Sequence, residues 1–411
     1  MQSNYSSMTK FIIPIGSLIL FSSLLACQKL EPAAPAADQV MDAPVEGLSP
    51  AQNRIFLQGA AEFDEVYTAA TGLGPTFVSN SCSSCHSGDN RGHLFTAITR
   101  YGQTAPGTNP YASLGGPQLQ PLSIAGFHAE ELPSGVSSSK FLAPIAAGVG
   151  FLEVIDDATI LSWADETDAN GDGISGVPNW VNIPSWVVPN DNAVVNNGKY
   201  IGRFGRKGST YNLHQQTVNA FHQDMGITST FIPFELYNPI EPMFAAPSQT
   251  PEVSDAGVSA TVFYLQVLQT PFQRNVEDAE VKKGLQVFQS IGCNNCHKET
   301  VNTGFSPIAQ LSFQTIHPYT DLLLHDMGEA LNDNYTEGSA LNTEWKTPAL
   351  WGLGLAPNVQ GNGYYLMHDG RAHSIEEAIL YHGGEGQNSS NQFQQLSQAD
   401  QQALIKFLKS L

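Results

Sequence analysis

Apolar side chains recur at helical spacing in three stretches of this 411-residue chain. The segment Ser49–Gln52 predicts a helix start, since a serine cap, a following proline and a glutamine three residues later are its usual signals. Similar capping patterns begin at Ser374 and Ser397. One helical face carries the apolar residues of each stretch: Phe56, Ala60, Phe63 and Tyr67, then Val281, Gly284, Leu285 and Phe288, and finally Leu404, Phe407, Leu408 and Leu411.

Further helices are predicted for Gln215–Asp224 and Val258–Leu268, whereas the Gly-, Pro- and Ser-rich residues 102–139 are typical of loops. A hydrophobic content of 41% is ample for buried cores. The length exceeds one ordinary domain of roughly 100–200 residues. We therefore predict a mainly α chain with two domains and long loops.

Two of these helices carry a G-x-x-x-F pattern, Gly59–Phe63 and Gly284–Phe288, and each is followed by C-x-x-C-H. That motif attaches a c-type haem: both cysteines form thioethers, and the histidine ligates the iron. The sequence thus predicts two c-type haems. The residues assigned to them are Cys82, Cys85 and His86, and Cys293, Cys296 and His297.

Other uses of C-x-x-C are a disulfide, a thioredoxin-like dithiol or half a zinc site. A redox dithiol does not need histidine twice at the same offset, and a zinc site needs more Cys or His nearby. The two copies use four of the five cysteines, and both are followed by histidine, so haem attachment is the favoured interpretation.

A helix with glycine and an aromatic residue at this spacing resembles the N-terminal helix of cytochrome c, where the glycine permits close crossing by the C-terminal helix. The fold class expected from it is mainly α, with two cytochrome c-like haem domains. Residues 48–275 would form the first, with insertions, and residues 276–411 the second. The boundary lies in the polar stretch before Ala279.

The chain is strongly acidic: 38 Asp and Glu against 18 Lys and Arg give a formal charge of −20 at pH 7. Such a surface repels nucleic acid, and no Lys/Arg-rich run offsets it, so we exclude a nucleic-acid partner. The acidity either forms a docking face for a basic redox protein or serves solubility alone.

Residues 1–27 are typical of an export signal, with Lys10 before a 15-residue apolar run that is short for a membrane span. The run ends at Leu24–Cys27, which resembles the lipobox of bacterial lipoproteins. We expect cleavage before Cys27 and its acylation, hence a lipid anchor in the periplasm or at the cell surface. The alternative is ordinary secretion with a free Cys27. Residues 28–47, rich in Ala and Pro, would be a linker.

The loop Asp168–Gly173 has the spacing of calcium loops, in which side chains at positions 1, 3 and 5 converge and glycine at position 6 permits the turn. An EF-hand has glutamate at position 12, where this chain has Asn179. The loop is either a calcium site of another kind or an Asx-rich turn. Its candidate ligands are Asp168, Asn170 and Asp172.

Two other polar features precede the second motif. Glu153 lies in an apolar stretch and is either a paired structural acid or a catalytic one. The segment Gly202–Lys207 is a basic cluster in an acidic chain. It either neutralises haem propionates and tunes the iron potential, or forms a solvated turn.

Six segments are distinctive when taken together: Ser81–His86, Asp172–Gly176, Gly202–Gly205, Asp224–Ser229, Tyr319–Gly328 and His368–Ala372. Jointly they resemble the bacterial di-haem oxidoreductases, a family described as peroxidases or thiol oxidoreductases. That family is related to di-haem cytochrome c peroxidases and MauG-type enzymes. The resemblance covers the chain from about Gly72 to the C-terminus.

The resemblance implies a ligand set for the second haem. In the related peroxidases a segment like His368–Gly370 leads into a helix that ends at a Met or Tyr ligand. Here His382 stands at that place, so His297 and His382 are the expected pair, with Met367 and Tyr381 as fallback ligands. Imidazole in place of thioether lowers the potential, because it stabilises ferric iron better.

For the first haem, the peroxidases carry a Glu-Met pair near the distal pocket, which Asp224–Met225 resembles. The resemblance implies that Asp224 is a general acid/base in O–O cleavage, or that Met225 is a sixth ligand that blocks peroxide. Four histidines are weaker distal candidates: His93, His128, His214 and His222.

We therefore expect a peroxidase-like di-haem enzyme. A small donor protein would reduce the second haem, and the first would reduce hydrogen peroxide or another small oxidant. Calcium between the units would hold the inter-haem geometry, and Trp345 or Trp351 lies on the electron path or in an aromatic core. The alternatives are a non-catalytic electron-transfer cytochrome and a di-haem oxidant of thiols or protein side chains.

Overall fold

The computed structural model describes residues 42–411 except 90, 106–110, 112–115 and 242–249. The export signal, Cys27 and most of the linker lie outside them. The last part of the linker is packed against the fold, since Val45 N donates to Val267 O at 2.8 Å and the Val45 side chain is buried. Among the described residues, no helix is long and apolar enough to cross a membrane.

The α-helices of this part are α2 (Pro50–Asp64), α3 (Cys82–Cys85), α4 (Val149–Glu153), α5 (Asp157–Leu161), α6 (Leu213–Met225), α7 (Asp255–Val267), α8 (Ala279–Ser290), α9 (Ala356–Val359), α10 (Ile375–Leu380), α11 (Gln387–Gln395) and α12 (Gln398–Ser410). The predicted starts are confirmed. Ser49 and Gln52 form both halves of a capping box on α2. Ser374 and Ser397 cap α10 and α12 through their side-chain oxygens.

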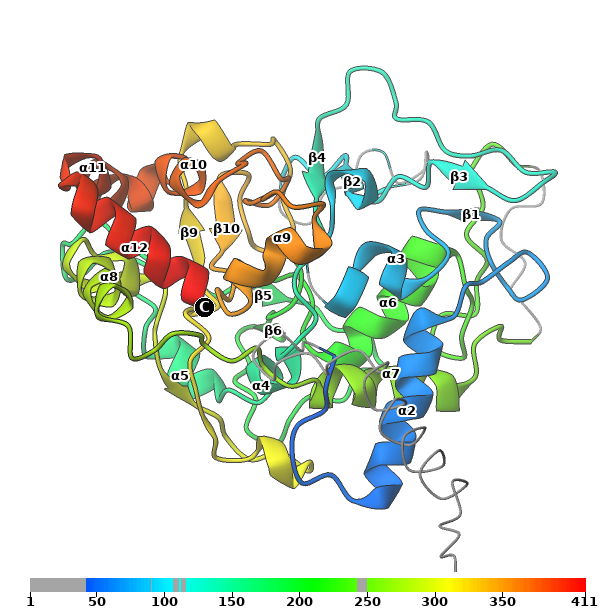
Figure 1. The fold of residues 1–411 in the computed structure, drawn as a ribbon. Coiled ribbons are helices and arrows are strands. Elements are labelled where there is room, and N and C mark those ends of the chain that lie inside the picture. The colour runs from blue at the N-terminus through cyan, green and yellow to red at the C-terminus, as the bar shows by residue number, and fades with distance from the viewer. Residues whose placement is uncertain (1–41, 90, 106–110, 112–115, 242–249) are drawn as a thin grey trace, which may run out of the picture. The chain divides into compact units, whose positions relative to one another are not determined.

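Two helix pairs cross at a glycine: α2 packs against α7 at Gly59, and α8 packs against α12 at Gly284 (Figure 1). A Cβ added at Gly59 would collide with Ala260 O and lie 2.6 Å from Tyr264 Cβ. The close crossing expected from the G-x-x-x-F pattern is therefore confirmed at both helices. At Gly284 the corresponding obstacles are Ala403 O and Phe407 Cβ.

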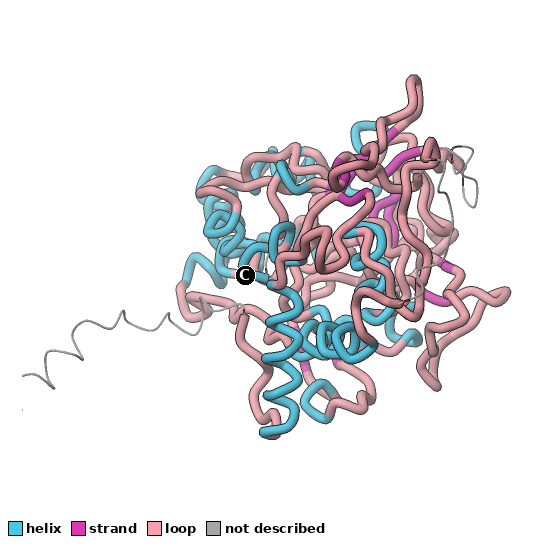
Figure 2. The backbone as a smooth tube through the Cα atoms, turned by 90° about the vertical axis from the view of Figure 1, so that its right-hand side faces the viewer, coloured by secondary structure: helices cyan, strands magenta, loops and turns pink. Residues whose placement is uncertain are grey.

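Five two-stranded antiparallel sheets accompany the helices in the described part. They pair β1 (Thr76–Phe77) with β3 (Leu122–Ser123), β2 (Ile98–Tyr101) with β4 (Ser138–Phe141), β5 (Trp180–Val181) with β6 (Tyr200–Ile201), β7 (Val301–Asn302) with β8 (Thr315–Ile316), and β9 (Leu324–Asp326) with β10 (Glu344–Lys346). Long loops join these elements (Figure 2). The fold is thus helices, small sheets and loops, and the description "mainly α" omitted the sheets.

The largest apolar cores follow the helix pairs. One contains Phe56, Phe63 and Tyr264 of the α2–α7 pair, together with Leu322 and Trp351 from far along the chain. The other lies wholly within residues 281–411 and surrounds the α8–α12 crossing. The described residues belong to one compact unit, and the boundary expected near residue 275 stays a prediction.

Candidate functional site

The second C-x-x-C-H segment follows α8 directly and forms the 3₁₀ turn Cys293–Asn295. Gly292 adopts the left-handed conformation, with φ 81°, that turns the chain out of α8. His297 N then donates to Cys293 O at 3.0 Å. This one-turn bond keeps the backbone of the histidine close to the turn that carries both cysteines.

The ring of His297 is orientated by the backbone. Its Nδ1 donates to Tyr319 O at 2.8 Å, so the hydrogen of the neutral ring is on Nδ1 and the lone pair is on Nε2. Burial lowers the pKa of His297 to about 4, which keeps the ring neutral. A metal-ligating histidine commonly has this arrangement, with the second nitrogen bonded to a carbonyl.

His382 follows α10 and mirrors that arrangement. Its Nδ1 donates to Ala378 O at 2.7 Å, and burial lowers its pKa. The His297 and His382 ring centroids lie 6.5 Å apart. Because a metal–nitrogen bond is about 2 Å long, two imidazoles on opposite faces of one metal have centroids roughly 6 Å apart. The separation therefore fits two axial ligands of a single iron.

Both histidines line one cavity, together with Cys293 and Cys296. The cavity measures about 230 Å³, far more than the roughly 10–15 Å³ that one water needs. No described residue hydrogen-bonds either Nε2 atom, and the buried hydroxyl of Ser390 on the cavity lining has no partner. The residues present therefore fit a haem. The apolar part of the lining includes Phe288, Leu350, Leu353, Leu366, Ile379 and Leu404.

Met367 also lines this cavity, so it keeps its place as a fallback ligand. Tyr381 caps the end of α10, and its ring faces the guanidinium of Arg371 at 5.9 Å. The geometry of the two imidazoles favours His382 over either of them.

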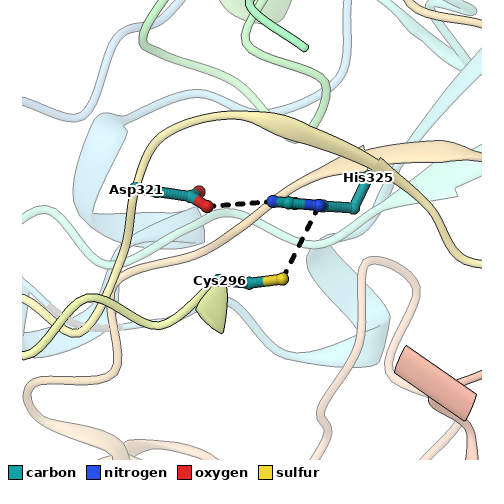
Figure 3. Close-up of side chains that lie close together, drawn as sticks. All are labelled: Cys296, Asp321 and His325. Atoms are coloured by element: carbon teal, nitrogen blue, oxygen red, sulfur yellow. Dashed lines mark hydrogen bonds and ion pairs between the residues drawn. The ribbon is translucent and has the colours of Figure 1, made fainter. Parts of the chain in front are cut away.

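A charged cluster that the sequence did not reveal adjoins Cys296. His325 lies between two carboxylates, with Nε2 2.9 Å from Asp321 Oδ2 and Nδ1 2.6 Å from Glu385 Oε2. Figure 3 shows His325 beside Asp321 and Cys296, whose Sγ is 3.6 Å from Nδ1. Burial alone lowers the His325 pKa, but its hydrogen bonds outweigh burial, and the pKa lies well above the ordinary value.

Three ligand-type atoms of Cys296, Asp321 and His325 lie within 4.8 Å of one another, the spacing of a metal site. Both nitrogens of His325 are hydrogen-bonded to carboxylates, however, and an imidazolium has no lone pair to give a metal. The cluster is therefore a buried cation with two acids, placed against one of the predicted haem cysteines.

The first C-x-x-C-H segment repeats the local geometry of the second. Its cysteines form α3, and His86 N donates to Cys82 O at 2.9 Å. The Phe63 ring lies 6.0 Å from the His86 ring at 55°, and the Phe288 ring lies 6.3 Å from the His297 ring at 56°. Both motifs thus hold their histidine in the same relation to the aromatic residue of the preceding helix.

Asp224 lies beside the first motif, at the end of α6. Its carbonyl accepts hydrogen bonds from Val78 N and Ser79 N, which ties α6 to the chain that enters the motif. Its buried carboxylate accepts from Gln118 Nε2 at 2.6 Å. Burial raises the Asp224 pKa, and Gln118 and Arg100 partly offset that rise. Gln118 had no signal in the sequence, because it comes from a loop over a hundred residues away.

Met225, the next residue, is only 2% exposed and packs in an apolar cluster with Phe221 and Ile227. Cys82 lies at the margin of that cluster. The structure therefore brings both distal candidates of the first haem, the acid and the thioether, to the first motif.

Residues 138–411 match the family described as "Di-haem oxidoreductase, putative peroxidase". The chain belongs to the di-haem oxidoreductase family. The match contains the second haem motif and Asp224–Met225, whereas Cys82–His86 precedes it. The first motif therefore stands on its residues and on the geometry that it shares with the second.

A solved hydrazine synthase from Kuenenia stuttgartiensis is similar to this chain with a TM-score of 0.40 and 15% sequence identity, over 100% of each chain. No curated protein matches the chain.

Both oxygens of the Glu153 carboxylate are occupied by hydrogen bonds to other helices. One carboxylate oxygen accepts from Leu213 N and the other from Gln266 Nε2, each at 2.7 Å. Burial raises its pKa, and these bonds oppose the rise. Glu153 thus joins α4 to α6 and α7. This favours a structural role for its carboxylate over a catalytic one.

The calcium-like loop closes on itself through Asx turns. Asp168 accepts from Gly173 N at 3.2 Å, Asn170 from Asp172 N at 2.8 Å, and Asp172 from Ile174 N at 2.9 Å. Calcium binding there stays a prediction. The loop reaches the second site through Ser175, whose hydroxyl donates to Glu385 Oε1.

The basic cluster of Gly202–Lys207 is buried and not a solvated turn. Arg203 pairs with Asp157, and Lys207 donates to Glu344 O and lies 3.8 Å above the Trp345 ring. Of the three basic residues Arg203, Arg206 and Lys207, only Arg206 lines the haem-sized cavity.

The four weaker histidine candidates have other surroundings. His222 Nε2 lies 3.0 Å from Phe234 O, and exposed His128 pairs with Glu241. His214 packs on Phe231, and His93 caps a short 3₁₀ turn. These contacts do not test the four as distal residues of the first haem, so they stay predictions.

Proposed function

We propose that this family member is a peroxidase-like di-haem c-type enzyme. The observation that carries the proposal is a repeated unit, a helix pair that crosses at a glycine followed by a C-x-x-C-H turn. Among the described residues, an opposed histidine is found at the second turn and not at the first. One haem would be held on both faces by the chain, and the other would be left for chemistry. Haem, when bound, supplies the iron that carries electrons and binds peroxide.

The two helix pairs support two cytochrome c-like units. In each, a leading helix meets a later helix at a glycine, and its aromatic residue faces the motif histidine. The first unit runs from α2 to α7 with long insertions, and the second from α8 to α12. The domains of residues 48–275 and 276–411 are proposed on this repetition.

In the second unit, His297 and His382 would hold the haem iron, and Cys293 and Cys296 would attach the haem through thioether bonds. Two neutral imidazoles favour a low-spin centre of low potential, which suits electron entry from a small donor protein. The ammonium of Lys207 over the Trp345 ring disfavours a positive charge on that indole. Of the two tryptophans, Trp351 is therefore the better candidate for the electron path.

In the first unit, His86 is the proposed proximal ligand and Asp224 the group that moves protons. Reduction of hydrogen peroxide to two waters consumes two protons and two electrons. Burial raises the pKa of the Asp224 carboxyl, which favours its holding a proton that it can donate during peroxide cleavage. Gln118 holds that carboxyl through its Nε2 atom.

We also propose roles for the lipid anchor, the calcium-like loop and the acidic surface. Acylation of Cys27 would anchor the chain in the periplasm or at the cell surface, where c-type haem is attached. Calcium at Asp168–Asp172 would act on the second haem through Ser175 and Glu385. The acidic surface would receive a basic donor protein.

The second candidate function is electron transfer without catalysis. Buried Met225 beside the first motif favours it, because a thioether on the first iron would exclude peroxide. Oxidation of thiols or protein side chains is the third, supported by the family relationship alone.

The test mixes half-reduced protein with hydrogen peroxide and follows the first haem by stopped-flow absorbance. We expect a fast reaction that Asp224→Asn slows about 10²–10⁴-fold, since general acid/base groups contribute that much. Asp191→Asn, the same change at an exposed carboxylate, should leave the rate unchanged. Absence of any reaction in the oxidised and half-reduced states would sink the peroxidase proposal.

A further inference from the structure

Three basic side chains, Arg91, Arg206 and Lys346, line the cavity of the second haem, and we call them the cationic wall. They come from distant segments: the chain just after the first motif, the loop after β6, and the end of β10. The lining of the cavity contains one acid, Glu385. Basic residues therefore outnumber acidic ones around the cavity, whereas the whole chain has 38 acidic and 18 basic residues.

Backbone carbonyls hold the wall in place without neutralising it. Arg206 Nε donates to Leu142 O at 2.8 Å, and Arg91 Nη2 donates to Ala349 O at 2.9 Å. The backbone of Lys346 is joined to that of Arg206 by an N–H···O bond of 3.3 Å. Carbonyls therefore hold the two guanidinium groups, and the strand that carries Lys346 is tied to the loop that carries Arg206.

Asp369 and Asp321 act on Arg206 and Lys346, respectively, only from beyond ion-pair distance. Neither Arg206 nor Lys346 makes an ion pair with a described carboxylate. Glu385 is already engaged by His325 and Ser175. Burial and the neighbouring Arg206 lower the pKa of Lys346 to about 8, and burial and Arg91 lower that of Arg206 to about 9. Clustered buried cations are costly unless an anion joins them.

We propose that the cationic wall binds the propionate carboxylates of the second haem, and so fixes the haem in its plane while the two histidines hold it along the axis. This inference rests on the proposed haem site. Arginine and lysine beside carboxylates form the strongest hydrogen bonds available to a buried anion. The fixed positive charge also stabilises the ferrous state, because that state carries one positive charge fewer.

The experiment measures the midpoint potentials of both haems in the full holoprotein by spectroelectrochemical titration. Lys346→Gln and Arg206→Gln should each lower the potential of the second haem. Lys346→Arg, which keeps the charge, should stay near the wild-type value. Lys282→Gln, the same charge change on the exposed side of α8, should have no effect.

Equal shifts in Lys346→Gln and Lys346→Arg would overturn the inference, because packing rather than charge would then be responsible. Unchanged potentials in both glutamine variants, with the second haem still attached and low-spin, would also overturn it. A second arm adds sulfate to the wild-type protein at constant ionic strength. A saturable shift would show that the wall is open to free anions and would contradict propionate binding. A chain without attached haem would instead refute the proposed function.

Discussion

At the second site, two backbone carbonyls set the ring orientation and the tautomer of His297 and His382. His297 Nδ1 donates a hydrogen bond to Tyr319 O, and His382 Nδ1 donates one to Ala378 O. Both Nε2 atoms therefore keep a lone pair for a ligand in the cavity. The sequence singled out His382 because it stands where related peroxidases have a ligand, and its role as a ligand stays a prediction. The carbonyl of Tyr319 was not predictable, because only the tertiary fold brings it to His297.

Replacing His382 by Ala tests the ligand assignment. We expect the low-spin spectrum of the second haem to be lost while that of the first is retained, because one axial nitrogen is removed. The measurement is the visible and electron paramagnetic resonance spectrum of the ferric holoprotein. His317→Ala, at an exposed histidine, is the control. An unchanged second-haem spectrum would rule out His382.

His325 gives a pH-dependent prediction. Its pKa is raised in the folded chain above the unfolded value near 6.5, so its contribution to stability is complete below about pH 6.5. That contribution is lost as the pH rises through the folded pKa. The melting-temperature difference between wild type and His325→Gln should therefore shrink on going from pH 6 to higher pH.

His317→Gln serves as the control for that series and should follow the wild-type curve. A difference that stays constant, or grows, as the pH rises would show that His325 is not a cation in the folded chain. His325 and Gln118 share the reason why they escaped sequence reasoning. Asp224 lies 106 residues from Gln118 and Glu385 lies 60 residues from His325, so no local spacing marks these two pairs, although Asp321 is only four residues from His325.

Among the elements, the helix crossings were the most predictable feature. Glycine and phenylalanine at fixed spacing before each motif indicated a close crossing, and capping serines gave the helix starts. The small sheets were not predicted, because strands of two to four residues are too short to show a period of two.

The crossing at Gly284 leads to a stability prediction. Gly284→Ala would push a methyl group into Ala403 O and Phe407 Cβ, so α8 and α12 must separate. Overpacking of this kind costs about 1–3 kcal/mol of unfolding free energy. Denaturant unfolding of the holoprotein measures it.

Gly363→Ala is the matched control for the crossing, since nothing lies within 4 Å of a Cβ at that glycine. It should change the unfolding free energy far less than Gly284→Ala. If the two variants were equally stable, the crossing would not be tightly packed.

On the scale of the whole molecule, the two haem motifs share a helix pair that crosses at a glycine and an aromatic residue beside the histidine, but their further surroundings differ. The second has an opposed histidine, a large cavity and the cationic wall. The first has a buried carboxyl and a buried thioether nearby. The sequence predicted both attachment turns from their spacing. It could not predict the cavity, because the lining comes from segments between Arg91 and Leu408.

The central claim is that the chain carries two unequal haems, one saturated by histidines and one open to peroxide. Electron paramagnetic resonance of the ferric and half-reduced protein, before and after peroxide and normalised to haem content, tests it most directly. The account predicts two haems per chain, one with a bis-histidine low-spin signal and one whose signal changes with peroxide. One haem per chain, or two low-spin signals that ignore peroxide in both redox states, would contradict it.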